Sequence, residues 1–214
     1  MARSSAPKPT LVLFVRHGRT PTTGAVLPGR APGLHLSDEG RAQAEVAAER
    51  IAGLKAVDAV YASPLERTRE TAAVIAKRLG QRVKLEKGLL EADFGDWTGA
   101  ELSGLRRRRE WKSVQNHPSA FRFPGGESFA EMQGRIVGAT RRLCAKHEGA
   151  TIVVVSHADP IKAALNEALG SHLDQFQRIV VSPCSISAVA YGSTATMVLA
   201  VNTTAGELAA LVPS

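Results

Sequence analysis

The chain has 214 residues, of which 44% are hydrophobic and 22% are charged. This length and composition are typical of a globular protein with one large domain or two small ones. The 27 Lys and Arg residues outnumber the 20 Asp and Glu residues, which gives a net charge of +7. A positive charge of this size attracts phosphate-bearing partners but does not indicate a fold.

The same sequence excludes a disulfide-rich protein and a protein with a membrane-spanning helix. The two cysteines, Cys144 and Cys184, are too few for a disulfide framework, and neither stands in a spacing typical of metal sites. No apolar run reaches the roughly 20 residues that span a bilayer. The N-terminal sequence is polar and lacks the apolar core of a signal peptide. We therefore expect a cytoplasmic protein that contacts no membrane.

The hydrophobic pattern predicts strands that alternate with helices. The first strand, LVLFV over 11–15, is apolar throughout, as are strands buried on both faces of a parallel sheet. A second strand of this kind, TIVVVS, covers 151–156. The other predicted elements are, in chain order, a Pro- and Gly-rich loop over 21–33, a helix over 38–52, a strand over 57–61, a helix over 65–79, a strand over 83–85, an ordered loop over 89–99, helices over 101–114, 128–147 and 160–169, and a hairpin of strands over 185–191 and 196–201.

This alternation is typical of a single three-layer α/β/α domain. We expect a mostly parallel sheet with an antiparallel edge strand. No shift in composition marks a boundary inside the chain, so the domain is placed at residues 10–205. A flexible N-terminal tail is expected at 1–9 and a C-terminal tail at 206–214.

The run Arg106 to Arg109 is the strongest local concentration of charge. Four consecutive residues point to all sides of a helix, so the run is interpreted as a solvated helix face rather than a nucleic-acid-binding stripe. It has no interleaved aromatic residues and no recognised nucleic-acid motif beside it. Nucleic acid is therefore not expected as a partner.

The two buried strands end alike, at Arg16-His17-Gly18 and at Ser156-His157-Ala158. Ligands of open α/β sheets bind beyond the carboxyl ends of the strands. If the two strands are neighbours, His17 and His157 face each other across one pocket. One Arg-His-Gly triplet alone is equally consistent with an ordinary end of a strand.

A predicted helix beginning near Ser63, which is a candidate N-cap, adds free N–H groups to the same region. Arg67 lies in the first turn of this helix and can reach the pocket. The guanidinium groups of Arg16 and Arg67 both match the geometry of a phosphoryl group. The pattern therefore points to an anion site.

Six segments follow one another along the chain: LFVRHGRT at 13–20, LSDEGRAQA at 36–44, YASPLERTRETA at 61–72, LLEADFGDWTG at 89–99, PGGES at 124–128 and VVVSHADPIKAAL at 153–165. In this order they resemble the motifs of the histidine phosphatase superfamily, also called the phosphoglycerate-mutase-like family. The resemblance covers residues from about 11 to 170, and the C-terminal hairpin adds no motif.

The resemblance implies that His17 is a nucleophile that becomes a phosphohistidine. It implies that Glu91 is the general acid that protonates the leaving oxygen and then helps to activate water. Arg16, Arg67 and His157 match the groups that hold the phosphoryl oxygens. Because His17 must be neutral while Glu91 must be protonated, we expect a bell-shaped pH profile.

The resemblance also places other residues near the site, without assigning each a chemical step. Gly18, Thr20 and Ala158 are expected in the phosphate-binding set, where Ala158 replaces the glycine common in the family. Arg19, at a position where many members carry Glu or Gln, and His172 are expected at the rim of the substrate pocket. No metal and no other cofactor is implied.

Three functions are compatible with these residues. The first is a metal-independent phosphomonoester hydrolase that acts on a small phosphorylated metabolite. The second is a phosphoglycerate-type phosphomutase, which alone would use 2,3-bisphosphoglycerate as cofactor. The third is a non-catalytic module that binds phosphorylated ligands, for which a nucleophile and an acid would be superfluous.

The phosphatase is favoured because the segment between Glu91 and Gly125 is short. True cofactor-dependent mutases carry a much longer insertion there, which serves the cofactor and the dimer. The stretch HPSAFRFPGGESFAEMQ also resembles an actinobacterial subgroup labelled as phosphomutases, but a label shared through a fold does not establish mutase chemistry. The family resemblance also allows a homodimer.

Overall fold

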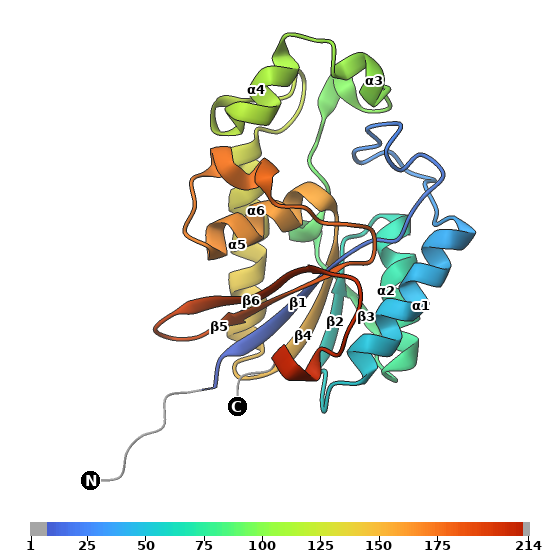
Figure 1. Ribbon diagram of the computed structural model, residues 1–214, viewed down its shortest axis with the longest axis vertical. Coiled ribbons are helices and arrows are strands. Elements are labelled where there is room, and N and C mark those ends of the chain that lie inside the picture. The colour runs from blue at the N-terminus through green and yellow to red at the C-terminus, as the bar shows by residue number, and fades with distance from the viewer. Residues whose placement is uncertain (1–7, 212–214) are drawn as a thin grey trace.

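The computed structural model describes residues 8–211. A six-stranded sheet forms its centre, with helices on both faces (Figure 1). The strands are β1 (Thr10–Arg16), β2 (Ala59–Ala62), β3 (Val83–Leu85), β4 (Thr151–Ser156), β5 (Ile186–Tyr191) and β6 (Thr196–Thr203). The α-helices are α1 (Asp38–Ala52), α2 (Glu66–Arg78), α3 (Leu102–Leu105), α4 (Glu110–Asn116), α5 (Phe129–Lys146) and α6 (Ala158–Ala168). Short 3-10 segments cover Lys87–Leu89, Gly95–Trp97, Pro118–Ala120, Leu173–Arg178 and Ala209–Leu211.

The strands are ordered β3-β2-β4-β1-β5-β6 across the sheet. Strands β3, β2, β4 and β1 are parallel, and β5 pairs antiparallel with both β1 and β6. The prediction of a mostly parallel sheet with an antiparallel edge is therefore confirmed, the edge being a hairpin. Strands β1 and β4 are neighbours, with Arg16 opposite Ser156, so the two similar strand ends lie side by side.

Alternation along β1 distributes its apolar side chains between two cores. Val12 and Phe14 belong to the core that contains residues of α5 and α6. Leu11, Leu13 and Val15 belong to the core that contains residues of α1 and α2. A strand that is buried on both faces must be apolar throughout, which explains the continuous run LVLFV.

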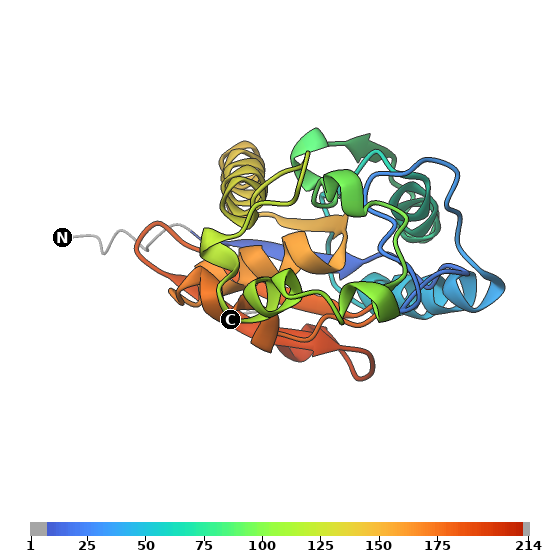
Figure 2. The ribbon, with the colours of Figure 1, turned by 90° about the horizontal axis from the view of Figure 1, so that it is seen from above.

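The segment between β3 and α5 lies across the carboxyl end of the parallel strands. Figure 1 shows α3 and α4 at the end of the molecule opposite the start of β1, and Figure 2 views that end from above. The prediction of one helix over 101–114 is wrong, because the chain forms α3 and α4 with a turn between them. Arg106 to Arg109 occupy this turn and are exposed, so the expected solvent exposure is confirmed and the helical face is not. Four adjacent cations, beside the helix-weakening Gly104, oppose a continuous helix.

The predicted tails fall partly outside the described chain. Of the expected tail at 1–9, residues 1–7 lie outside the described residues, as do residues 212–214 of the expected tail at 206–214. The rest of the C-terminal segment packs on α1, where Arg50 donates hydrogen bonds to the carbonyls of Ala205 and Gly206 at 2.7 and 2.9 Å. Leu208 is buried in the core beside α1 and α2. Within residues 8–211, no helix combines the length and apolarity that crossing a membrane requires.

Candidate active site

A cleft of about 530 Å³ opens beyond the carboxyl ends of β1 and β4. It is lined by Arg16, His17 and Glu91, and by residues of the loop after β1, of α3 and α4, and of α6. The other lining residues are Thr20, Thr23, Gly24, Val26, Leu27, Pro28, Phe94, Leu102, Arg106, Trp111, Val114, Gln115, Phe123, Phe129, Ala158, Asp159, Lys162 and Gln177.

His17 follows directly from β1 and is 6% exposed. Its backbone N–H donates to the carbonyl of Ser156 at 3.0 Å, which fixes the residue against the end of β4. Its ring nitrogen Nδ1 lies 2.8 Å from the Gly18 carbonyl oxygen. Burial, reinforced by the charges of Arg67 and Arg16, lowers the pKa of His17 well below its ordinary value. His17 is therefore neutral near pH 7, which is the form that the expected nucleophile requires.

His157 lies at the end of β4, with its ring centroid 5.2 Å from that of His17. The expected proximity of the two rings is confirmed, but they meet edge to face at an interplanar angle of 64°, and His157 is fully buried and does not line the cleft. The Nε2 atom of His157 lies 2.9 Å from the hydroxyl of Ser63, while Nδ1 has no partner among the described residues. Burial and the charge of Arg67 lower the pKa of His157 as well.

Ser63 thus has a role other than the predicted one. Helix α2 begins at Glu66 with Leu65 as N-cap, and no side chain caps it. The buried Ser63 hydroxyl instead holds the His157 ring. If this hydroxyl donates to Nε2, a neutral His157 carries its proton on Nδ1 and can donate it to a ligand.

The two arginines present unused donors to the same region. Arg67 is fully buried in the first turn of α2, and its Nη2 donates to the Gly29 carbonyl at 2.7 Å. The Nη1 of Arg16 donates to the Val181 carbonyl at 2.8 Å. Within the described chain, Nε of Arg16 and both Nε and Nη1 of Arg67 are buried without a partner. Buried donors of this kind are costly unless a ligand satisfies them, and an oxyanion is the complementary ligand.

Glu91 lines the cleft from the segment that follows β3 and is 8% exposed. Its Oε1 accepts a hydrogen bond from the Ala92 N–H at 2.9 Å, and its Oε2 lies 4.0 Å from Nδ1 of His157. Burial, together with the charge of Asp159, raises the pKa of Glu91 to about 7. Since burial favours the neutral form of both groups, the contact with His157 is not an ion pair.

Three of the remaining predicted residues lie beside these groups. Thr20 and Ala158 line the cleft, and the Thr20 hydroxyl lies 3.0 Å from that of Thr23. The backbone N–H of Gly18 is already used, because it donates to Thr71 Oγ1 at 3.1 Å. Gly18 therefore serves close packing rather than offering a free N–H to phosphate.

Arg19 and His172 do not line the cleft. Arg19 is exposed and forms an ion pair with Glu39 at 3.2 Å. The Nδ1 of His172 accepts a hydrogen bond from the Asp174 N–H at 3.3 Å, on the exposed surface. Between residues 8 and 211, no group of three or more His, Cys, Asp or Glu side chains is arranged to hold a metal ion.

The sequence interpretation missed several residues near the reacting groups. Asp159 and Lys162, inside the segment at 153–165 but given no role above, line the cleft, as does Gln177, which belongs to no motif. Arg30 and Arg135 contact the backbone of Glu91 from two different elements. Two motifs, PGGES with Glu127 and LLEADFGDWTG with Glu91 and Asp93, contact these arginines, but neither contains them.

Comparisons with known proteins agree with this geometry. Residues 12–204 match the histidine phosphatase superfamily (branch 1). A bifunctional protein of Mycobacterium tuberculosis is 34% identical over 202 residues, which are 92% of this chain and 54% of that protein. The chain thus spans about half the length of its mycobacterial relative. Phosphoserine phosphatase 1 of Hydrogenobacter thermophilus is 29% identical over 90% of this chain and 92% of its own length.

Solved structures show the same fold. A phosphoserine phosphatase mutant from Entamoeba histolytica, in complex with phosphoserine, has a TM-score of 0.82 and 26% identity, over 91% of this chain and 98% of its own. A mycobacterial glucosyl-3-phosphoglycerate phosphatase has a TM-score of 0.80 and 22% identity, over 90% and 98% of the two chains. The fold, the paired strand ends and the sequence match over nearly the whole domain lead to one conclusion: this chain belongs to the histidine phosphatase superfamily.

Proposed function

We propose that this protein is a metal-independent phosphomonoester hydrolase that acts through a phosphohistidine at His17. The observation that carries the proposal is the set of buried, unpartnered N–H donors of Arg16 and Arg67 around a neutral His17. The Glu91 carboxyl lines the same cleft, and its pKa of about 7 leaves a large fraction of it protonated near neutral pH. A module that only binds phosphate would need the donors but neither the nucleophile nor the acid.

Each group has one task in the proposed reaction. In the first half-reaction, a ring nitrogen of His17 attacks phosphorus, the ester P–O bond breaks, and Glu91 gives its proton to the leaving oxygen. Arg16, Arg67 and His157 hold the phosphoryl oxygens and stabilise their charge, which is the main requirement of phosphoryl transfer. In the second half-reaction, the Glu91 carboxylate takes a proton from water, water attacks the phosphohistidine, and inorganic phosphate leaves. The covalent intermediate divides one difficult displacement into two easier ones.

We propose a small anionic metabolite as the substrate class. Arg106 and Lys162 add two cations to the lining of the cleft. Lys162 also lies 3.3 Å from the Asp159 carboxylate, so Arg106 is the cation less committed to the protein. The relatives described above are named for phosphoserine and glucosyl-3-phosphoglycerate, which are both small and anionic.

The test is phosphate release from p-nitrophenyl phosphate and a panel of small phosphomonoesters, with excess chelator and without added metal. The wild type should release phosphate, and His17→Ala should lose at least about a thousandfold in kcat, as removal of a covalent nucleophile does. Unchanged activity in His17→Ala would contradict the proposal.

A parallel assay follows the interconversion of 3- and 2-phosphoglycerate with 2,3-bisphosphoglycerate. Isomerisation with little phosphate release would make the protein a mutase. If both activities are absent while inorganic phosphate still binds, the protein is a binding module.

The location and assembly of the protein belong to the same proposal. Cys144 and Cys184 are free thiols, which suits the reducing cytoplasm. A homodimer stays a prediction from the resemblance, and light scattering of the purified protein measures it directly.

A further inference from the structure

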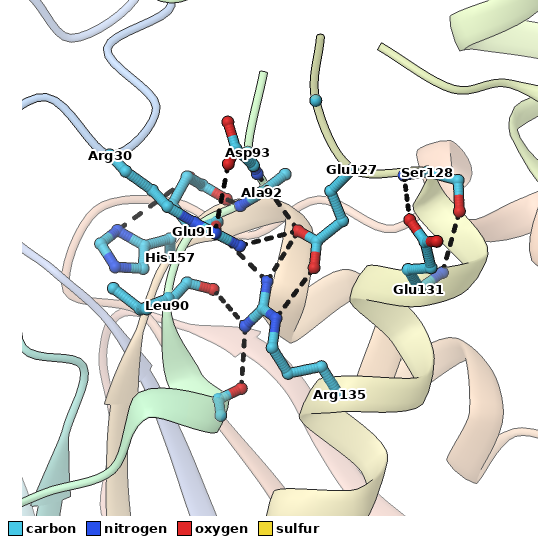
Figure 3. A network of polar contacts seen from close by, with 12 residues as sticks. Arg30, Leu90, Glu91, Ala92, Asp93, Glu127, Ser128, Glu131, Arg135 and His157 are labelled. Atoms are coloured by element: carbon cyan, nitrogen blue, oxygen red, sulfur yellow. Dashed lines mark hydrogen bonds and ion pairs between the residues drawn. The ribbon is translucent and has the colours of Figure 1, made fainter. Parts of the chain in front are cut away.

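The chain segment that carries Glu91 is held from two sides by arginines. The Nε of Arg30, from the loop after β1, donates to the Glu91 backbone carbonyl at 2.8 Å. The Nη2 of Arg135, from α5, approaches the same carbonyl oxygen at 3.3 Å. Nη1 of Arg135 also donates to the carbonyls of Leu90 and Gly88 at 2.8 and 3.0 Å. Figure 3 shows the two guanidinium groups beside the backbone of the Glu91 segment.

Glu127 joins these two arginines to each other. Its Oε2 accepts from Nη2 of Arg30 at 3.0 Å and from Nη2 of Arg135 at 2.9 Å, and its Oε1 accepts from Nε of Arg135 at 3.0 Å. The same carboxylate accepts the backbone N–H of Asp93 at 3.1 Å. Glu127 directly precedes Ser128, whose capping box begins α5, so the group is tied to the start of a long helix (Figure 3).

The loop residue next to Arg30 connects this group to the anion pocket. The Gly29 carbonyl accepts from Nη2 of Arg67 at 2.7 Å, while Arg30 contacts the Glu91 carbonyl. Gly29 has φ +52°, and a Cβ there would lie 3.0 Å from Thr98 Oγ1. Two consecutive residues therefore contact both a candidate phosphate ligand and the segment of the candidate acid.

We propose that Arg30, Glu127 and Arg135 are positioning residues that hold the Glu91 carboxyl in line with the leaving oxygen. This inference rests on the proposed function. Within the described chain, the Glu91 carboxyl accepts a single hydrogen bond, from its neighbour Ala92, so its location depends on where its backbone is held. Directed bonds to main-chain carbonyls fix that backbone. Apolar packing would stabilise the turn without the desolvation cost of three charged groups, but it would not direct the carbonyl.

A displaced acid has a specific kinetic signature. An alkoxide leaving group needs a proton in the transition state, whereas p-nitrophenolate leaves readily without one. The value of kcat/KM reports the first half-reaction, in which Glu91 acts as acid. Loss of positioning therefore lowers kcat/KM for alkyl phosphates and spares p-nitrophenyl phosphate, whereas general damage to the site lowers both.

The experiment compares the wild type with Arg30→Lys, Arg135→Lys and Glu127→Gln on glycerol 2-phosphate and p-nitrophenyl phosphate. We expect kcat/KM for glycerol 2-phosphate to fall roughly 10- to 100-fold, the range that a misplaced general acid costs. We expect p-nitrophenyl phosphate hydrolysis to stay within about threefold. The matched control is Arg141→Lys, which alters a surface ion pair of α5 with Glu167 and should change neither value.

A double-mutant cycle separates positioning from stability. In a Glu91→Gln background, Arg30→Lys should cause no further loss on glycerol 2-phosphate, because the acid is already absent. Arg30→Lys is the decisive single variant, since its side chain is 32% exposed and the substitution keeps the charge. Its Tm should remain within a few degrees of the wild type.

Two results overturn the inference. Equal losses of kcat/KM on both substrates in Arg30→Lys would show general disruption of the site. Unchanged kcat/KM on both would show that Arg30 does not position the Glu91 carboxyl. In both cases the wild type still works and His17→Ala does not, so the proposed function stands. If the wild type releases no more phosphate than His17→Ala, the proposed function fails first.

Discussion

Two buried side chains of the cleft carry opposite proton requirements, and one physical cause satisfies both. In the proposed reaction, His17 must be neutral to attack, and Glu91 must be protonated to donate. Removal from water favours the uncharged form of each group, so it lowers the pKa of the imidazole and raises that of the carboxyl to about 7. The cationic arginines add to the first shift and oppose the second.

These pKa shifts predict the pH dependence of catalysis. The active free enzyme has Glu91 protonated and His17 neutral, so kcat/KM should fall as the pH rises through about 7. On the acid side, kcat/KM should fall only well below pH 6.5, since the pKa of His17 is lowered from that value. The measurement is kcat/KM for an alkyl phosphate from pH 4 to 9 in buffers of constant ionic strength.

Glu91→Gln tests the assignment of the alkaline limb. The variant should be slower by roughly a hundredfold on alkyl phosphates, and its kcat/KM should no longer fall across pH 7. An alkaline limb that persists in Glu91→Gln would assign the titration to another group.

The residues of the site differ in how far the sequence predicts them. The similar ends of two buried strands place His17 and His157 together once the strands are neighbours, and the pairing of β1 with β4 supplies that condition. Glu91 stands among several acids, and only the family resemblance singles it out. Ser63 was interpreted as a helix cap, because a serine before a helix is more often a cap than a partner of a distant histidine. The arginines around Glu91 come from separate elements, and no spacing in the sequence relates them.

At the scale of elements, the loop after β1 lies directly against the start of α1. A Cβ on Gly18 would lie 2.4 Å from the Gly40 carbonyl oxygen, and a Cβ on Gly40 would lie 2.0 Å from that of Arg19. Both obstacles are backbone atoms, so they cannot move aside as a flexible side chain could. The absence of side chains at these two glycines lets α1 support the loop that carries His17.

Gly40→Ala should therefore destabilise the protein by about 1–3 kcal/mol, the usual cost of overpacking. It should also lower kcat, since the loop after β1 must shift. The matched control is Gly134→Ala in α5, where nothing lies within 4 Å of the new Cβ. That substitution should stabilise the helix by up to about 1 kcal/mol and leave kcat unchanged. Urea denaturation and steady-state kinetics of both variants measure these effects. Equal free energies of unfolding in the two variants would contradict the prediction that Gly40 is packed against backbone.

The elements above the cleft show where local patterns fail. The predicted helix over 101–114 divides at Arg106 to Arg109, and tertiary packing then fixes the course of the two pieces. Trp97 is 2% exposed and stacks on Trp111 with ring centroids 6.4 Å apart, and it also contacts Phe121 and Phe123. Contacts between residues so far apart in sequence are not visible in hydrophobic periodicity. The alternating strands and helices, whose cores depend on local periodicity, are predicted well.

At the scale of the whole molecule, part of the positive charge is buried, in the guanidinium groups of Arg16 and Arg67. The net charge is +7, and desolvation by burial lowers the pKa of both Arg16 and Arg67. A buried guanidinium with unused donors reduces the stability of the folded state. A bound oxyanion removes that penalty, and the unfolded chain offers no comparable site.

Inorganic phosphate should therefore raise the Tm of the protein. At a concentration a hundredfold above Kd, the gain of about 2.7 kcal/mol corresponds to a shift of roughly 5–10 °C for a chain of this size. His17→Ala should keep most of the shift, because the donors of the two arginines remain, and Arg67→Gln should lose it. Differential scanning fluorimetry measures these shifts. Sodium chloride of equal ionic strength is the control for general screening of the positive charge, and an equal shift with chloride would exclude a specific site.

One main-chain contact of His17 determines which of its two ring nitrogens is free to act as a nucleophile. A carbonyl oxygen can only accept a hydrogen bond, so the ring atom 2.8 Å from the Gly18 carbonyl must carry the proton. Nδ1 therefore carries the proton, and the free lone pair is that of Nε2. In the proposed reaction the phosphorylated enzyme is then a single regioisomer, the Nε2-phosphohistidine, and the polypeptide backbone rather than any catalytic side chain selects the nitrogen.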